Sequence, residues 1–241
     1  MRPRKTTYLV HRWIGLFIAL QLLAWSIGGF VFSVLDIRAV RGEHNSTMIE
    51  ARPLDAAAVP AHLREAVGAA GVCTTLELID RGLGPHWEAR DVDGVLLVRM
   101  GSDGSPAGPV TIEQAEAIAM DDFVHGSGVA RSSVIEADPP VEYRGRPLPI
   151  YQIELDHASR TRIYVDAATG AITARRNRSW RLFDFFWMLH TMDYGGRDDF
   201  NHPLLTGASI LAILASGSGL TLWGWRATSQ IRRKTERKPS N

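Results

Sequence analysis

Two long runs without a charged residue dominate the pattern of hydrophobic and polar positions along the chain. The first extends from Trp13 to Leu35 and the second from Pro203 to Trp225. Each run has about 23 residues, and at about 1.5 Å per residue in a helix this length matches the ~30 Å hydrocarbon core of a bilayer. The pattern therefore predicts two transmembrane helices, at residues 11–36 and 203–225.

A cleaved signal sequence is the alternative explanation for the first run, because basic residues precede it at Arg2, Arg4 and Lys5. Signal sequences have an apolar region of about 7–15 residues that ends at small residues. This run is longer and continues into the bulky sequence VFSVLDI. We therefore expect an uncleaved membrane anchor.

Between the two runs, helical and strand-like patterns alternate in two successive passages. A helix-like stretch opens each passage: residues 54–70 are rich in alanine, and residues 111–123 begin with Thr111, a residue type that caps helices. Strand-like runs follow at residues 86–92, 94–100, 132–137, 148–156 and 161–172. The central segment is therefore expected to be an α+β domain of helices and antiparallel sheet.

The two passages share landmarks, which indicates an internal repeat. Comparable positions in strands and closing turns are occupied by Trp87 and Tyr151 and by Gly104 and Gly170. The period is roughly 65 residues. We therefore predict tandem modules at residues 47–108 and 109–178.

Aromatic rings and charges gather in residues 179–202, directly ahead of the second run. Residues with large side chains recur there at spacings of three and four: Leu182, Phe183, Phe186, Trp187, Leu189 and His190. This spacing predicts an amphipathic helix in the membrane interface, ended by Gly195 and Gly196, with a loop after it. His202 and Pro203 then open the second span, with the proline in its first turn.

The net charge of +1 argues against a nucleic-acid partner. Basic residues gather in residues 1–10 and in a tail at residues 226–241. Because positive segments beside a span stay in the cytoplasm, both termini are expected there and the central domain on the far side. Four arginines between Arg175 and Arg181 run against this rule, but they lie beyond ~20 residues from the second span, where the rule loses force.

Several motifs resemble one family of bacterial envelope proteins. TRIYVDAATGAI (161–172) resembles the terminal strand and hairpin of the PepSY domain. LVHRWIGLFIAL (9–20) is similar to the first-span signature of PepSY-associated transmembrane proteins, and WMLHTMDY and SGLTLWGWR (218–226) are similar to their second-span region. The resemblance implies an inner-membrane protein with a periplasmic domain of two PepSY-like modules, the first of them (47–108) a degenerate copy.

The same resemblance implies two kinds of function. The family's domain is similar to a binding or inhibitory module, and several membrane relatives resemble ferric-siderophore reductases that hold haem b between spans. Haem b in a bilayer needs two neutral imidazoles at one depth. His11 opens the first span at the inner face, about 35 Å from the outer face, whereas His190 and His202 precede the second span at the outer face. One haem therefore cannot join His11 to either of the others.

Three alternatives stay open for these histidines. His190 and His202 can form a pair within one chain, His11 or His190 can pair with its copy in a homodimer, or the chain binds no haem. The competing interpretation places His11 in an aromatic belt at the headgroups and His190 on the interfacial helix. Small residues four apart, such as Gly15 and Ala19, predict close packing of the spans on each other or on a partner.

Other chemistry has little support in the sequence. Acidic residues and an imidazole close to one another, Asp193, Asp198, Asp199 and His202, suit a divalent metal, but their spacing fits no known site and favours a solvated loop. The chain has no HExxH, GxSxG, Walker A, GxGxxG or CxxC motif, and the lone Cys73 forms no intrachain disulfide.

The leading hypothesis is an accessory or binding subunit, anchored in the bilayer, that takes a protein or peptide partner in the periplasm rather than acting as an enzyme. The first alternative is a haem b electron-transfer protein that assists ferric-chelate reduction and iron uptake. The second alternative is a regulator of an envelope peptidase.

Overall fold

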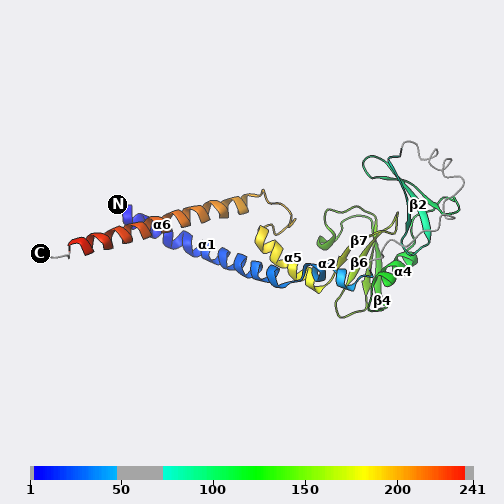
Figure 1. Ribbon diagram of the computed structural model, residues 1–241, viewed down its shortest axis with the longest axis horizontal. Helices are drawn as coiled ribbons and strands as arrows, with labels where there is room; N and C mark the ends of the chain where they lie inside the picture. The colour runs from blue at the N-terminus through cyan, green and yellow to red at the C-terminus, as the bar shows by residue number, and fades with distance from the viewer. Residues whose placement is uncertain (1–2, 48–72, 237–241) are drawn as a thin grey trace. The chain divides into compact units, whose positions relative to one another are not determined.

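The computed structural model describes residues 3–47 and 73–236 of the 241-residue chain. The chain divides into two units: unit 1 comprises Met1–Val34 with Phe183–Asn241, and unit 2 comprises Leu35–Leu182. Unit 1 is helical, and unit 2 contains two antiparallel sheets with short helices (Figure 1). The predicted α+β class of the central domain is therefore confirmed.

Unit 1 is built on two long helices, α1 (Pro3–Val34) and α6 (Pro203–Glu236), which cross in Figure 1. Both are long and apolar enough to cross a membrane, over Thr6–Val34 and Pro203–Gln230. α1 begins before its predicted span and α6 ends after its own, because a span ends where charges begin whereas a helix continues through lysine, arginine and glutamine, which are good helix formers. Each helix begins at a proline, whose fixed φ suits the first turn.

One side of α1, a stripe formed by every seventh residue, faces the other helices of unit 1. The stripe consists of His11, Ile18, Trp25 and Phe32, and Gly28 lies on the same side. A seven-residue repeat is the period at which two helices stay in contact at a shallow crossing angle. At the N-terminal half of the stripe the partner is α6, where Ala208 and Ala215 are buried.

The C-terminal half of the stripe packs on a third helix, α5 (Arg178–Thr191). The ring of Phe32 lies 4.7 Å from the ring of Phe183. Trp25 Nε1 donates a hydrogen bond to the carbonyl oxygen of His190 at 3.1 Å. Residue numbers fall along α5 as they rise along α1, so the two helices run antiparallel.

The predicted helix in residues 179–202 is therefore present as α5, but its predicted end was wrong. The helix stops at Thr191, four residues before Gly195. Met192 adopts a left-handed φ of 57°, and the Asp193 carboxylate then accepts hydrogen bonds from four backbone N–H groups, those of Gly195, Gly196, Asp198 and Asp199. The hydrogen bonds of the Asp193 side chain to the backbone, and not the pair Gly195–Gly196, therefore accompany the end of the helix.

Unit 2 opens with the short helices α2 (Ile37–Arg41) and η1 (Glu43–Asn45). Its first sheet is an antiparallel meander of β1 (Thr75–Asp80), β2 (Pro85–Arg90) and β3 (Leu96–Gly101). The strand-like runs 86–92 and 94–100 correspond to β2 and β3, whereas β1 was not predicted. The predicted helix at residues 54–70 lies outside the described residues.

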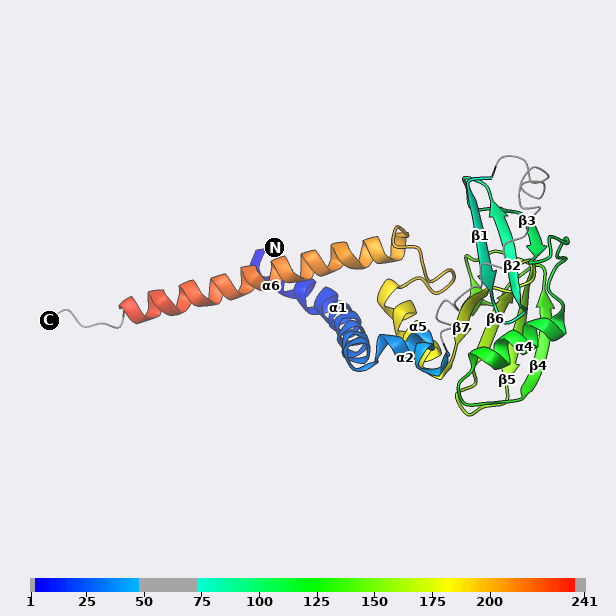
Figure 2. The same cartoon turned by 45° about the vertical axis from the view of Figure 1, so that its right-hand side comes forward.

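The second sheet follows the helix α4 (Ile112–Asp122). It is a meander of β4 (Val129–Ile135), β5 (Ile150–Leu155), β6 (Arg162–Asp166) and β7 (Ile172–Arg176), with the short helix η3 (Val141–Tyr143) between β4 and β5. Figure 2 shows α4 lying across one face of this sheet. The predicted cap is confirmed, because Thr111 and Gln114 form a reciprocal capping box.

The core of unit 2 lies between α4 and the second sheet. Ala115 and Ile118 of α4 are buried against Ile153 and Ile163 of the sheet. Arg81 links the two sheets, because it bonds to Glu88 in β2 and to the carbonyl oxygen of Thr169 in the turn between β6 and β7. That the sheets are two copies of one module stays a prediction.

Candidate functional site

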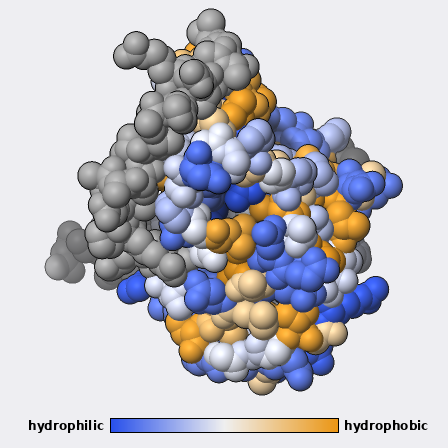
Figure 3. All heavy atoms as spheres, turned by 90° about the vertical axis from the view of Figure 1, so that its right-hand side faces the viewer, coloured by the Kyte–Doolittle hydropathy of each residue, from blue (hydrophilic) through white to orange (hydrophobic). Residues whose placement is uncertain are grey.

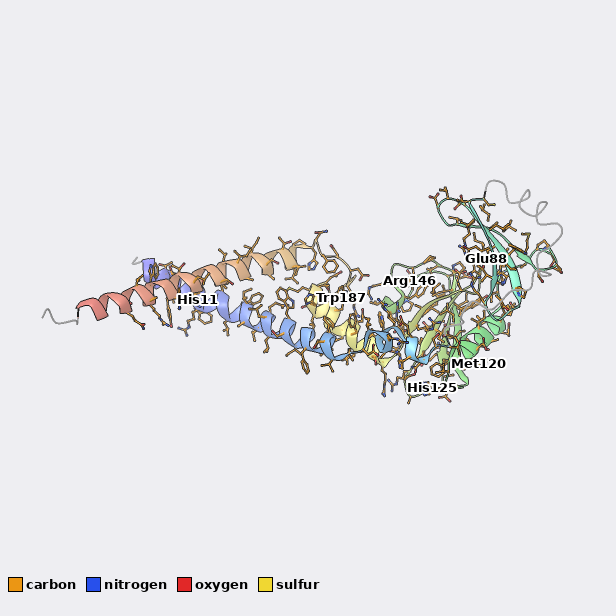
Figure 4. The ribbon with its side chains drawn as sticks, viewed as in Figure 1. His11, Glu88, Met120, His125, Arg146 and Trp187 are labelled. Carbon is orange, nitrogen blue, oxygen red and sulfur yellow. The ribbon has the colours of Figure 1, made fainter. Side chains whose placement is uncertain are left out.

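His11 lies where α1 crosses α6 (Figure 4). Its Nδ1 lies 2.9 Å from Ser218 Oγ and 3.2 Å from the carbonyl oxygen of Ala215. A carbonyl oxygen only accepts, so Nδ1 donates the proton and Nε2 is the acceptor nitrogen of the ring. A Cβ at Gly219 would come within 3.0 Å of His11 Cε1, so glycine makes room for the imidazole.

A groove of about 650 Å³ runs beside His11 between the two helices. Small residues on both helices, among them Gly15, Ala19, Ser216 and Gly219, keep it open. These positions agree with the predicted close approach of the spans. The lining is apolar apart from His11, Arg12 and Ser216, so the groove suits an apolar ligand or another helix.

His190 and His202 both belong to the other end of this helical unit, His190 to the last turn of α5 and His202 to the residue before α6. The His190 ring is 5.9 Å from the Trp25 ring and 6.2 Å from the Phe32 ring. His202 Nε2 lies 2.9 Å from the carbonyl oxygen of Thr191, and its Nδ1 accepts a hydrogen bond from the N–H of Leu205. His202 therefore ties the end of α5 to the start of α6 with both ring nitrogens.

His11 is well separated from this pair. His190 contacts Trp25, which is 14 residues from His11 along α1, or about 21 Å. His11 is thus apart from His190, as the sequence indicates, but the distance is shorter than the predicted ~35 Å. α5 packs alongside α1, so that His190 lies level with Trp25 and not at the end of α1. Ligation of haem by His11, His190 or His202 stays a prediction.

In the acidic loop before α6, charged side chains contact the loop backbone and the helix α5. Hydrogen bonds from backbone N–H groups, first that of Asp199, hold the pKa of the Asp193 carboxyl below its usual range. Arg197 forms an ion pair with Asp184 of α5, and its carbonyl oxygen accepts a hydrogen bond from Trp187 Nε1 at 2.9 Å. Among the residues the structure describes, no group of three or more His, Cys, Asp or Glu side chains is placed to hold a metal ion.

Unit 2 has a pocket lined by charges that the sequence did not reveal. It measures about 290 Å³ and is lined by Glu154, Arg160, Arg162, Arg178 and Arg181, which we call the arginine pocket. In the sequence, Arg178 and Arg181 stood out only as exceptions to the charge rule for membrane topology. The remaining residues come from β5, the β5–β6 turn and β6, and no local pattern predicts that the fold brings them together.

Glu142 anchors one side of the arginine pocket. Its carboxylate lies 2.9 Å from Arg181 Nε and 3.1 Å from an Arg162 nitrogen, and accepts a hydrogen bond from the Tyr164 hydroxyl at 2.7 Å. Burial alone would raise the pKa of Glu142, but the bonds from Arg181 and Tyr164 outweigh burial and hold the pKa below its usual value. Glu142 is therefore charged and fixes two of the guanidinium groups.

The second sheet of unit 2 also ends in an open strand. β4 pairs only with β5 within the described residues, and Val134 on it is 51% exposed. Apolar and hydrophilic side chains are interspersed over the face of the molecule in Figure 3. An edge strand with an exposed apolar side chain is a surface on which another strand can pair.

Comparison with known proteins matches nearly the whole chain to one family. The model of the PepSY-associated TM region matches residues 8–241. No curated protein and no solved structure matches the chain. The match spans α1, both sheets and α6, in agreement with the resemblance seen in the first-span, hairpin and second-span motifs. With two helices apolar enough to cross a bilayer, the chain is a membrane protein and belongs to the PepSY-associated transmembrane family.

Proposed function

We propose that this chain is an accessory or binding subunit of the bacterial envelope. In this proposal α1 and α6 cross the inner membrane with both termini in the cytoplasm. Residues 47–178 form two PepSY-like modules in the periplasm and bind a protein or peptide partner there. The basic segments at both chain ends support the orientation.

The open edge of β4 is the observation that carries the proposal. A partner in extended conformation gains main-chain hydrogen bonds by adding a strand to such an edge, and its side chains contact alternate residues of the edge strand. Val134, at 51% exposure, offers an apolar contact to such a partner. A permanently exposed edge of this kind is an aggregation hazard unless a partner or charged side chains cover it.

Two other strand edges of unit 2, those of β7 and β3, are partly covered. The carbonyl oxygen of Thr173 in β7 accepts a hydrogen bond from Arg146. Beside β3, the N–H of Ala107 donates to the carbonyl oxygen of Arg99 at 2.9 Å and the N–H of Gly101 donates to that of Ser105 at 2.8 Å. These contacts favour β4 over β3 and β7 as the docking edge.

Photo-crosslinking from β4 in intact cells tests the proposal. A photoreactive amino acid at position 133 is expected to give an adduct of discrete size. Val134→Lys places a charge on the edge and is expected to abolish the adduct, whereas Val92→Lys, the same change at an exposed turn residue, is expected to keep it. An adduct that persists in Val134→Lys, or no adduct from position 133, contradicts the proposal.

Haem-dependent electron transfer is the second candidate, and the geometry of His11 favours it. A ligating histidine usually donates its other ring N–H to a carbonyl or carboxylate oxygen, and His11 Nδ1 has this arrangement with Ala215 and Ser218. The lining of the groove includes no second histidine, so the other ligand would be His11 of a second copy in a homodimer. Bound haem b would supply one-electron transfer at this site.

An absorption spectrum of the detergent-purified chain distinguishes the two candidates. Haem ligation through His11 predicts a Soret band that His11→Ala abolishes and Ser218→Ala shifts or weakens. His190→Ala is the control for the alternative pair at the other end of the unit. Colourless protein after expression with ample haem contradicts the haem candidate and leaves the binding proposal in place.

A further inference from the structure

We propose that the arginine pocket binds the phosphate group of an anionic membrane lipid. Four guanidinium groups and one carboxylate line its volume of about 290 Å³. The guanidinium fork matches the oxygens of a phosphate in pairs, and a cluster of such forks is the usual protein partner of phosphate. The inference concerns a different surface from the β4 edge and goes beyond the proposed binding of a protein partner.

The charges in and beside the pocket do not balance. Arg162 bonds to Glu154 at 2.9 Å and to Glu142 at 3.1 Å, and Arg181 bonds to Glu142. Arg160 and Arg178 are exposed, and within the described part of the chain neither guanidinium has a carboxylate partner. Two guanidinium groups therefore face the pocket with their charge uncompensated, which is the charge that a phosphate group neutralises.

Backbone contacts fix the walls of the pocket before any ligand arrives. The N–H of Arg178 donates to the carbonyl oxygen of Ser159 at 3.1 Å, and an Arg181 nitrogen donates to that of Arg160 at 2.8 Å. These bonds join the β5–β6 turn to the first turn of α5. Arg160 itself has a left-handed φ of 50°, and the two bonds hold the turn in that shape.

The course of α5 favours a lipid over a soluble anion. Phe183 packs on Phe32, close to the end of α1 at Val34. Arg181 precedes Phe183 by about 3 Å along the helix, and Arg178 by about 8 Å. Arg178, Arg181 and Phe183 therefore lie on one continuous helix, α5, within six residues of chain. Two arginines of the pocket are thus joined, along the same helix, to a ring that contacts a candidate membrane span, and this connection favours a membrane lipid as the ligand.

Native mass spectrometry of the full chain, purified in detergent, tests the proposal. Phosphatidylglycerol is expected to be retained about tenfold or more over zwitterionic phosphatidylcholine, since each of the two uncompensated arginines contributes roughly fivefold to the binding of an anionic lipid. The double variant Arg160→Gln/Arg178→Gln is expected to reduce retention of phosphatidylglycerol to the level of phosphatidylcholine. Arg131→Gln, which removes an exposed arginine on β4, is the matched control and is expected to retain the lipid.

A variant that binds more lipid distinguishes a role of the pocket in binding from a loss of binding caused by misfolding. Glu154→Gln removes the carboxylate from the pocket and is expected to increase retention of phosphatidylglycerol, an effect that damage to the fold would not produce. Unchanged lipid retention in the double variant overturns the proposal. So does binding of inorganic phosphate at the pocket without preference for phosphatidylglycerol. Val134→Lys is expected to leave lipid retention unchanged, so this proposal and the proposed function fail independently.

Discussion

Glu88 is a buried carboxylate in the first sheet of unit 2, and basic side chains surround it. It is 1% exposed, and its carboxylate bonds to Arg81, to Arg90 at 2.7 Å and to His86 at 3.3 Å. Removal of one member of a buried ionic network leaves the others uncompensated and typically costs several kcal/mol. We expect Glu88→Gln to lower the free energy of unfolding by about 3 kcal/mol, measured by pulse proteolysis in urea. Glu136→Gln, the same change at an exposed residue, is the control and is expected to have no measurable effect.

The loss caused by Glu88→Gln also depends on pH. Burial would raise the pKa of Glu88, but hydrogen bonds from His86, Arg81 and Arg90 outweigh burial and hold the pKa far below its ordinary value of 4.5. A group with a lowered pKa in the folded state contributes its stability above the ordinary pKa and loses it as the pH falls below that value. The difference in unfolding free energy between Glu88→Gln and wild type is therefore expected to be constant from pH 7 to 5 and to shrink below about 4.5. A difference that grows on acidification contradicts this explanation.

Gly104 and Gly170 show which properties of a turn glycine can be predicted from the sequence and which cannot. Both were predicted to close comparable turns, and both adopt left-handed φ angles, 82° and 76°. Only Gly170 is also crowded: a Cβ there would lie 3.1 Å from Ile118 and 3.2 Å from Val110, whereas nothing lies within 4 Å at Gly104. The shared turn conformation follows from local sequence, but the crowding depends on packing between distant segments.

The two glycines are therefore expected to respond differently to alanine. Gly104→Ala incurs the backbone strain alone, about 1 kcal/mol. Gly170→Ala adds overpacking against the core and is expected to cost about 3 kcal/mol in all. Thermal unfolding of the full chain in detergent measures both. Equal losses would show that the crowding at Gly170 relaxes without cost.

At the scale of elements, the seven-residue stripe of α1 packs on two different helices, α6 and α5. A Cβ at Gly28 would lie 3.8 Å from Phe186 of α5, an ordinary contact, whereas nothing lies within 4 Å of Gly29. A leucine at position 28 would extend into α5, but at position 29 it would point away from the described helices. We expect Gly28→Leu to destabilise unit 1 by about 1–3 kcal/mol and Gly29→Leu to have little effect, in thermal melts of the detergent-solubilised chain. Equal melts for the two variants would contradict the packing of α5 on α1.

Sequence patterns predicted the helices better than the strands. The apolar runs of α1 and α6 and the capped helix α4 are long periodic signals, which makes them the easiest elements to recognise. The sequence TLELID of β1 has the alternation of a strand, but it is short and less apolar than the neighbouring runs, and β1 was not predicted. The end of α5 was misplaced, because the hydrogen bonds of one aspartate and not the Gly195–Gly196 pair determine it.

The arginine pocket was beyond local sequence reasoning for a related reason. Glu142, Arg162 and Arg181 lie on three different elements, and the hydrogen bonds among them exist only when η3, β6 and α5 meet. Histidines in a sequence indicate candidate ligands, because imidazole commonly binds haem iron and metals. Arginines in a chain with a net charge of +1 gave no comparable signal.

At the scale of the whole molecule, the orientation in the membrane determines which compartment each site faces. Cys73 is the only cysteine of the chain, and its side chain is partly exposed beside the first sheet. If unit 2 lies in the periplasm, a membrane-impermeant maleimide is expected to label the chain in spheroplasts without lysis, and Cys73→Ser is expected to abolish the label. A second variant, Cys73→Ser with Ser229→Cys near the end of α6, is expected to be labelled only after lysis, because the basic tail beside it stays in the cytoplasm. The reverse pattern would place the β4 edge and the arginine pocket in the cytoplasm, where a lipid bound by the pocket would come from the inner leaflet.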